Sequence, residues 1–165
     1  MDFFEGTLVW HLAGNYTDEE TETEFGVKTP AGAQATYDFA GSLSGASQFA
    51  GVPKLHAILS TTYAQGPWSG TVQTRYLSAA VLANGWTSGV QVDNNSVPAV
   101  AYLDLRGSYK WNDNLEFYAA VDNTLNTPPP NIASYSVSNN GLSTVNPSIY
   151  DVLGRMYHAG FRFNY

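Results

Sequence analysis

Cysteine is absent from the 165-residue sequence, and charged side chains are scarce. Without cysteine the chain has no disulfide bonds and no thiolate metal sites. Charged residues make up 13% of the chain, about half of the roughly 25% found in soluble domains. Aromatic residues, by contrast, reach 14%. Plentiful aromatic side chains and few charges are typical of a lipid-facing β-barrel.

Long apolar runs and basic patches are also missing. The longest apolar candidate, residues 77–83, is far shorter than the ~18 residues of a membrane-spanning helix. Mean hydropathy is −0.20, so if the chain crosses a membrane, it must do so with strands. The formal net charge of −7 argues against nucleic-acid binding, because no basic patch is present to displace phosphate counterions.

The first residues do not have the pattern of a signal peptide. Met1-Asp2-Phe3 begins with an acid, and no basic region followed by an apolar region comes after it. An exported barrel needs such a signal. We therefore expect this sequence to be the C-terminal part of a longer protein.

The last nine residues are the most informative stretch. Aromatic and small apolar residues alternate with polar ones, with a period of two: the apolar set is Tyr157, Ala159, Phe161, Phe163 and Tyr165. This alternation suits a strand between lipid and a wet interior. The strand reaches the last residue, whereas soluble proteins usually end in a frayed polar tail.

Six segments have this alternation: residues 7–16, 54–63, 68–77, 101–111, 115–122 and 157–165. Within them all charged residues share the polar face: Lys54, Arg75, Asp104, Arg106, Lys110, Glu116, Asp122 and Arg162. The histidines His11, His56 and His158 share it too. Such segregation is expected in a membrane barrel, because a Lys or Arg that faces the bilayer midplane costs about 2–4 kcal/mol.

Short and long connections alternate between the segments. Residues 64–67 and 112–114 form tight turns, whereas residues 17–53, 78–100 and 127–156 form long polar connections without strong periodicity. Short periplasmic turns and long extracellular loops are the rule in outer-membrane barrels. The predicted fold is all-β: an antiparallel up-and-down transmembrane β-barrel segment of about six strands. Its C-terminus lies on the periplasmic side.

Six strands are too few to close such a barrel, because bacterial single-chain barrels begin at about eight. Unpaired backbone groups at two open edges would cost several kcal/mol each in hydrocarbon, or tens in total. We therefore expect either a larger barrel of which this chain is a part, or several copies that pair edge to edge.

Two sequence motifs resemble a known family. Residues 121–126, Val-Asp-Asn-Thr-Leu-Asn, followed by prolines, resemble the V-x-N-L-F-N…P stretch near the end of TonB-dependent outer-membrane receptors. Residues 150–157, Tyr-Asp-Val-Leu-Gly-Arg-Met-Tyr, are similar to the family's Y-D-x-x-G-R-x-[YF] close. Residues 53–56 and 68–76 are similar to earlier hairpins of the family. Tyr165 replaces the commoner terminal Phe, and Met156 replaces a residue that is often polar.

The resemblance implies a barrel of about 22 strands that is filled by an N-terminal plug domain. Such receptors take up a scarce nutrient, such as a siderophore, cobalamin or a glycan, across the bacterial outer membrane. This chain would then contact membrane lipid and the rest of the receptor. The barrel-assembly machinery would recognise its C-terminal strand as an edge signal. The signal residues are Tyr157, Phe161, Phe163 and Tyr165.

No catalytic, cofactor or metal site is expected, so the chain is not predicted to be an enzyme. The acidic run from Asp18 to Glu24 matches no EF-hand spacing, and the histidines are predicted to line the lumen. Aromatic residues in the long connections are candidate ligand contacts. Trp86 and Tyr135 are the main candidates, and the others are Tyr37, Phe39 and Phe49.

Three other classes of protein stay open at this point. The chain could be the tail of another large barrel, such as a porin or an usher-like channel. An outer-membrane hydrolase would need a Ser or Asp with His at one rim, a combination that these residues do not present. A soluble β-sandwich binding module would have two packed sheets and would bury Phe161, Phe163 and Tyr165.

Overall fold

The computed structural model describes residues 2–3, 5–43, 52–132, 135–136, 142–143 and 145–165. The regular structure in this part of the chain is entirely β. Within the same residues, no helix has the length and apolar character needed to cross a membrane.

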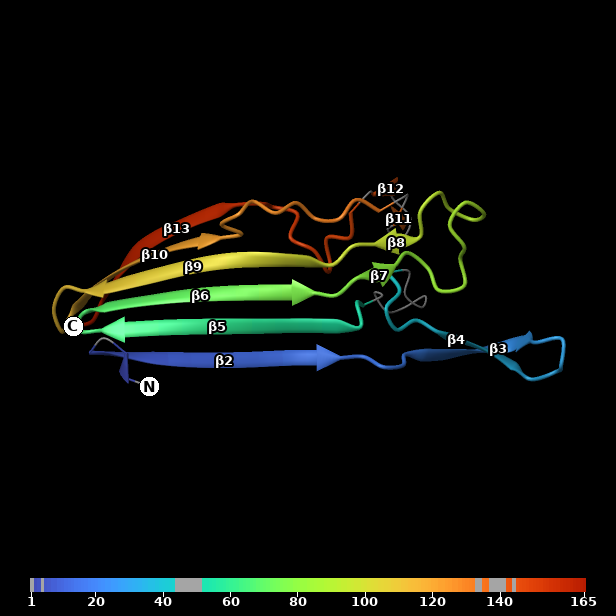
Figure 1. Cartoon of the computed structure of the whole chain (residues 1–165), viewed down its shortest axis with the longest axis horizontal. Helices are drawn as coiled ribbons and strands as arrows, with labels where there is room; N and C mark the ends of the chain where they lie inside the picture. The colour runs from blue at the N-terminus through green and yellow to red at the C-terminus, as the bar shows by residue number, and fades with distance from the viewer. Residues whose placement is uncertain (1, 4, 44–51, 133–134, 137–141, 144) are drawn as a thin grey trace.

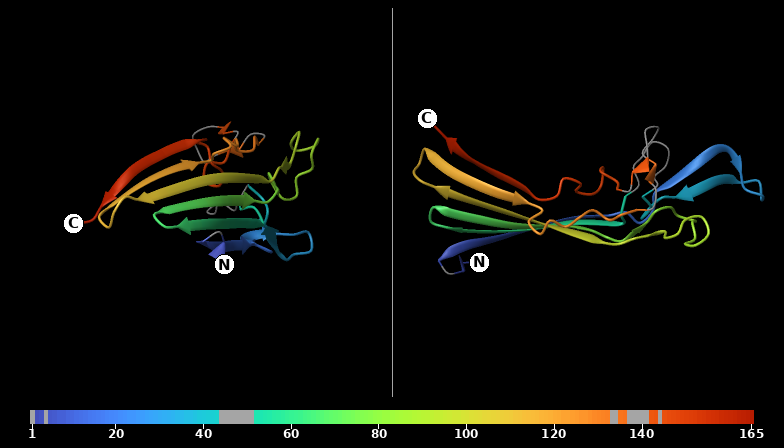
Figure 2. Two further views of the ribbon diagram at one scale, coloured as in Figure 1. Left: turned by 60° about the vertical axis from the view of Figure 1, so that its left-hand side comes forward. Right: turned by 90° about the horizontal axis from the view of Figure 1, so that it is seen from above.

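Seven antiparallel strands form the main sheet, which is curved and not closed (Figures 1 and 2). Within this sheet, each strand pairs with the strand of the same sheet that comes next in the sequence. In spatial order they are β1 (Asp2–Phe3), β2 (Gly6–Tyr16), β5 (Leu55–Gln65), β6 (Trp68–Leu77), β9 (Val100–Lys110), β10 (Leu115–Asp122) and β13 (Met156–Phe163). The predicted open, up-and-down antiparallel segment is confirmed, and a soluble sandwich of two packed sheets is not what the chain forms.

The predicted strand bounds differ from the observed ones by one or two residues in β2, β5, β9 and β13. Lys54 lies just before β5, and Trp111 lies just after β9. The last strand ends at Phe163, two residues earlier than predicted, although the amide of Asn164 still donates to the carbonyl of Asn114 at 2.9 Å.

Each long connection contains a short hairpin that the sequence analysis missed. The hairpins are β3 (Thr21–Lys28) with β4 (Gln34–Asp38), β7 (Ala80–Val81) with β8 (Ser96–Val97), and β11 (Tyr135–Ser136) with β12 (Leu142–Ser143). Residues 21–24 alternate Thr and Glu, so they read as a solvated charge run. They form a strand because β4 pairs with them, and the hydroxyls of Thr23 and Thr36 lie 3.1 Å apart.

The strand registers test the predicted faces independently, because directly paired residues project to the same side of a sheet. Trp68 pairs with Tyr109, Tyr109 with Phe117, and Phe117 with Phe161, which gives one aromatic row across four strands. The rings of Trp68 and Tyr109 lie 4.3 Å apart, centroid to centroid. This side is hereafter the apolar face.

The opposite side, the polar face, carries the charges of β6, β9, β10 and β13. The pairs Glu116–Arg162 and Glu116–Lys110 fix the registers of three of these strands. By the same registers, the charged residues that share this face are Arg75, Asp104, Arg106, Lys110, Glu116, Asp122 and Arg162. The predicted segregation of charge is therefore confirmed across strands and not only within each strand.

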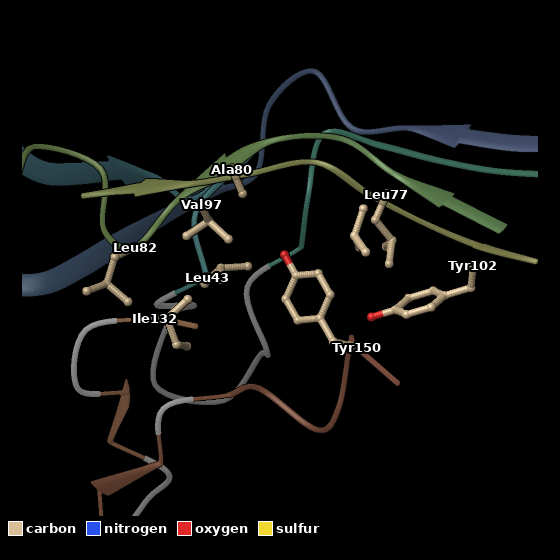
Figure 3. Packing of buried hydrophobic residues seen from close by; sticks show 9 residues of the cluster. Leu43, Leu77, Ala80, Leu82, Val97, Tyr102, Ile132 and Tyr150 are labelled. Carbon is tan, nitrogen blue, oxygen red and sulfur yellow. The ribbon is translucent and has the colours of Figure 1, made fainter. Parts of the chain in front are cut away.

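The polar face becomes apolar where the strands run into the long connections. Leu77, Val100 and Tyr102 occupy polar-face positions, yet all three are buried. Side chains from the long connections cover them and complete one hydrophobic cluster (Figure 3): Leu43, Ala80, Leu82, Val97, Ile132 and Tyr150. This loop cluster therefore joins all three long connections over the polar face. Burial of the Tyr150 side chain in the cluster raises the pKa of its hydroxyl to about 12.

Candidate functional site

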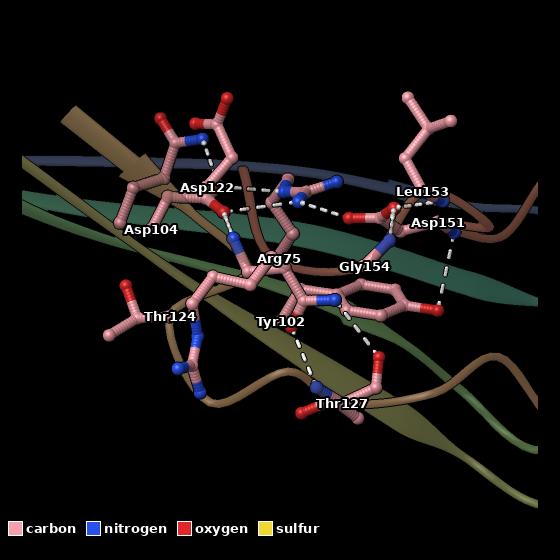
Figure 4. Close-up of polar contacts among 12 residues, drawn as sticks. Arg75, Tyr102, Asp104, Asp122, Thr124, Thr127, Asp151, Leu153 and Gly154 are labelled. Atoms are coloured by element: carbon pink, nitrogen blue, oxygen red, sulfur yellow. Dashed lines mark hydrogen bonds and ion pairs between the residues drawn. The ribbon is translucent and has the colours of Figure 1, made fainter. Parts of the chain in front are cut away.

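An ion pair lies beside the loop cluster, on the polar face of β6 and β9 (Figure 4). Arg75 Nε donates to Asp104 Oδ2 at 2.8 Å, and Arg75 Nη2 donates to Asp104 Oδ1 at 3.1 Å. The side chain of Asp104 is only 3% exposed, whereas that of Arg75 is 29% exposed. Two parallel bonds between a guanidinium and a carboxylate make this a geometrically specific contact.

Further donors saturate the Asp104 carboxylate. The backbone amide of Asn123 donates to Oδ1 at 2.9 Å, and the side chain of Gln73 donates to Oδ2 at 3.3 Å. A buried charge is tolerated only when it is paired and hydrogen-bonded, and this carboxylate has four donors. The guanidinium of Arg75 also lies 3.6 Å from Asp151 and 5.1 Å from the ring centre of Tyr102.

The first family-like motif forms the turn that ends β10. Asn123 and Asn126 have positive φ values of 49° and 53°, a conformation that Asn tolerates better than most residues. The side chain of Asn123 closes the turn, because it accepts from the amide of Thr127 at 2.8 Å and donates to the Thr127 carbonyl at 2.9 Å. Asn123 is fully buried.

The second motif forms the turn before β13. Asp151 Oδ1 accepts from the amides of Leu153 and Gly154 at 3.0 and 3.2 Å. The amide of Asp151 in turn donates to the hydroxyl of Tyr102 at 3.3 Å. The turn is thus held to β9 by Tyr102 and to β6 by Arg75.

The two motifs also contact each other. The amide of Arg155 donates to Asn126 Oδ1 at 3.1 Å, and a Cβ atom at Gly154 would lie 3.0 Å from the same oxygen. Arg75, Asp104, Asn123, Asn126 and Asp151 therefore form one joint, hereafter the loop joint. It ties both ends of the connection between β10 and β13 to the wall of the sheet.

Gly154 is a sensitive position of the loop joint, because its φ of 73° and the nearby oxygen of Asn126 both disfavour a side chain. We expect Gly154→Ala to lower the free energy of unfolding by about 2 kcal/mol, of which about 1 kcal/mol comes from the backbone conformation alone. Amide hydrogen exchange at Arg155 should accelerate.

Gly66→Ala is the matched control. Gly66 has a φ of 54°, but no atom lies within 4 Å of its Cβ position. Equal losses of stability for the two variants would show that the contact between the two motifs contributes nothing.

A second line of charges follows β10 and β13 on the polar face. His158 Nε2 lies 2.8 Å from Asp122 Oδ2, Arg106 lies 4.0 Å from Asp122, and Arg162 bonds Glu116 at 3.1 Å. These side chains are more exposed than Asp104, and exposed ion pairs contribute little to stability. They make the sheet wall polar without forming a buried centre.

Among the described residues, no three His, Cys, Asp or Glu side chains gather to hold a metal ion. His11 and His56 lie on β2 and β5, and His158 lies on β13. The structure therefore offers a positioning network as its candidate functional site.

The predicted site residues are not members of the loop joint. Tyr157, Phe161 and Phe163 lie on the apolar face of β13, each more than half exposed, and Tyr165 follows the strand. Their role as an assembly signal stays a prediction.

The candidate ligand contacts are scattered over the long connections. Trp86 is 46% exposed between β7 and β8, and the side chain of Asn95 donates to its carbonyl at 2.9 Å. The backbone of Tyr135 pairs with Ser143 in the hairpin of β11 and β12. Tyr37 and Phe39 lie at the end of β4 with ring centres 6.5 Å apart, and Phe49 lies outside the described residues. These contacts stay predictions.

The sequence analysis placed Arg75 and Asp104 on the polar face and Asn123, Asn126 and Asp151 in the two family-like motifs, but it did not predict that these residues contact one another. Arg75 and Asp104 are far apart in the sequence, and their contact depends on the register of β6 against β9. The available signal was the presence of Asn and Asp at fixed places in both motifs, because these residues favour turns.

Comparison with known proteins identifies the family. The profile of the family described as "TonB dependent receptor-like, beta-barrel" matches residues 3–123, which include strands β2 to β10 and the buried Asn123. The second motif and β13 lie beyond this match. Neither the curated proteins nor the solved structures that were searched give a match. Because the profile covers well over half of the sequence, the chain belongs to the TonB-dependent receptor-like β-barrel family.

Proposed function

We propose that this chain is the C-terminal part of the barrel of a TonB-dependent nutrient receptor in a bacterial outer membrane. The plug domain and the remaining strands would belong to the same, longer protein. The family is one of outer-membrane receptors for transport, and it is not a family of enzymes. The observation that carries the proposal is the open sheet with one apolar and one polar face.

The open edges support a larger barrel. On one side β1 pairs only Asp2 and Phe3 with β2, so the nine residues from Leu8 to Tyr16 have no strand beside them there among the described residues. On the other side β13 is the last strand of the sheet. Unpaired backbone groups at membrane depth cost several kcal/mol each, which further strands of the receptor would remove.

The aromatic residues of the apolar face support a membrane position. Trp68 and Tyr76 lie at the two ends of β6, eight residues apart on this face. Eight residues span about 27 Å of strand, or about 21 Å along the membrane normal at a tilt of about 40°. That height is close to the ~25 Å apolar band between the aromatic girdles of outer-membrane barrels.

Four roles follow for this part of the receptor. The sheet closes the barrel wall, the loop cluster covers part of the lumen at its outer end, and the exposed Trp86, together with Tyr135, contributes to nutrient capture. The last strand, with Phe161, Phe163 and Tyr165, serves as the signal for the barrel-assembly machinery. The nutrient belongs to the class of siderophores, cobalamin or glycans.

The test is nutrient uptake by cells with and without the gene that encodes the chain. Deletion is expected to abolish growth on one limiting nutrient from a panel of iron chelates, cobalamin and glycans. A plasmid copy should restore growth, and a protonophore should stop uptake. Equal growth of both strains on every nutrient of the panel would overturn the proposal.

A further inference from the structure

The loop cluster contains a buried hydroxyl that has no partner. Tyr150 is only 3% exposed, and its hydroxyl makes no hydrogen bond to any described residue. Figure 3 shows this hydroxyl directed among the apolar side chains of the cluster, which lack the several polar partners that hold a buried water molecule. A polar group that gives up its bonds to water and gains none in the protein disfavours the buried state.

A second buried polar group without a partner lies on the same short segment. Asn146 is 1% exposed, and its Oδ1 accepts from the amide of Ser148 at 3.0 Å. Its Nδ2, by contrast, donates to no described residue. Two groups on one segment therefore oppose its burial against the sheet, and both would regain hydrogen bonds if water reached them.

The segment that carries these two groups is a turn with its own hydrogen bonds. The amides of Ile149 and Tyr150 donate to the carbonyl of Asn146 at 3.3 and 3.1 Å. These bonds lie within the turn, so movement of the whole turn away from the strands breaks none of them. The side chains of Ile149 and Tyr150 pack against the loop cluster through apolar contact, which has no directional requirement. The turn can therefore move as one unit.

The residue that follows this turn is fixed to the wall of the sheet. The amide of Asp151 donates to the hydroxyl of Tyr102 at 3.3 Å, and its carboxylate lies 3.6 Å from Arg75. The loop joint thus holds the chain directly after Tyr150. A change from a fixed segment to one held only by apolar contact is where a hinge is expected, because few backbone angles need to change there.

We propose that residues 145–150 form a lid, which lies closed over the outer end of the polar face and opens about a hinge at Tyr150 and Asp151 to admit the nutrient. The two unpartnered groups shift the equilibrium toward the open lid, and the loop joint keeps the wall intact while the lid moves. The inference rests on the proposed function, because it assumes that the polar face lines the path of a nutrient.

Opening of the lid is measured with a buried thiol in the full receptor. This chain has no cysteine, and Ala80 is a buried member of the loop cluster, so Ala80→Cys provides the thiol. A water-soluble maleimide reacts with it only when the cluster opens. Tyr150→Phe removes the unpartnered hydroxyl and should slow labelling at least about fivefold, because an unpaired buried polar group shifts an equilibrium by that factor or more. Unchanged or faster labelling would overturn the proposal.

Tyr102→Phe is the matched control, because it removes a buried hydroxyl that does have a partner, the amide of Asp151. This variant loosens the hinge and should not slow labelling of the thiol. Equal slowing by both variants would show that the effect does not depend on the unpartnered hydroxyl of Tyr150. Labelling should also respond weakly to urea, because a local opening exposes little surface. A response as steep as that of global unfolding would overturn the lid.

The role of the lid in transport is measured by uptake of the nutrient that the growth panel identifies. At low nutrient concentration Tyr150→Phe should slow uptake at least about fivefold, by the same factor as thiol labelling, because entry requires the open lid. Slowed labelling with unchanged uptake would overturn this role. If labelling is slowed and no nutrient is transported, the proposed function fails together with the role of the lid in uptake, whereas the opening of the lid stands.

Discussion

Asp104→Ala is expected to lower the free energy of unfolding by about 3 kcal/mol. The variant leaves the Arg75 guanidinium without its bidentate partner and the amide of Asn123 without its acceptor. Removal of one partner of a buried ion pair typically costs about 3–5 kcal/mol. The lower end applies because Arg75 keeps Asp151 at 3.6 Å and is 29% exposed.

Denaturant unfolding in lipid vesicles measures this loss, and two variants control it. Asp122→Ala removes the same chemical group from an exposed pair, so it should cost less than about 1 kcal/mol. The double variant Arg75→Met, Asp104→Leu removes both charges and should recover most of the stability. If Asp104→Ala and Asp122→Ala cost the same, the loop joint is not a buried centre.

Hydrogen exchange in the Asp104→Ala variant locates the loss. The amide of Asn123 loses its acceptor, whereas the turn at Asp151 keeps its contact with Arg75 on β6. Exchange should therefore accelerate most in the turn that ends β10, while amides in the middle of β5 keep their protection. Uniform acceleration over the whole sheet would instead indicate a general loss of stability.

Leu12→Arg is expected to cost about 2–4 kcal/mol, because it places a guanidinium on the apolar face near the middle of β2. Val9→Arg, on the polar face of the same strand, is the matched control and should cost less than about 1 kcal/mol. Leu12 pairs with Leu59 and Val9 with Thr62, so the registers assign them to opposite faces. Unfolding in lipid vesicles measures both.

The relative costs of the two arginine substitutions show which face of β2 lies against lipid. If Leu12 faced water, Leu12→Arg would be neutral, because the side chain is 76% exposed and packs little within the sheet. A larger loss for Val9→Arg than for Leu12→Arg would mean that the lipid-facing and lumen-facing sides are reversed.

The strands of the main sheet could be predicted closely because their alternation is strict. The bounds of β6 and β10 match the predicted ranges, and the cross-strand pairs confirm both faces. Alternation predicts strands well since one face is apolar over the whole width of the membrane. Alternation predicts the structure less well in the long connections, where no face is continuously apolar.

The rest could not be predicted because it depends on contacts between distant segments. Tyr102 and Leu77 are apolar residues on a polar face, and only the long connections that fold over them explain their burial. The strand β3 reads as a charge run until β4 pairs with it. The loop joint likewise needs the register that brings Arg75 beside Asp104.

Fluorescence quenching of single tryptophans tests the central claim most directly, namely that the apolar face of this open sheet lies against membrane lipid. Trp10 and Trp68 lie on that face and are 63% and 64% exposed, whereas Trp86 lies in a long connection. In vesicles, brominated lipid should quench Trp10 and Trp68 strongly, and iodide should quench only Trp86. Quenching of Trp10 by iodide, without quenching by brominated lipid, would contradict the account.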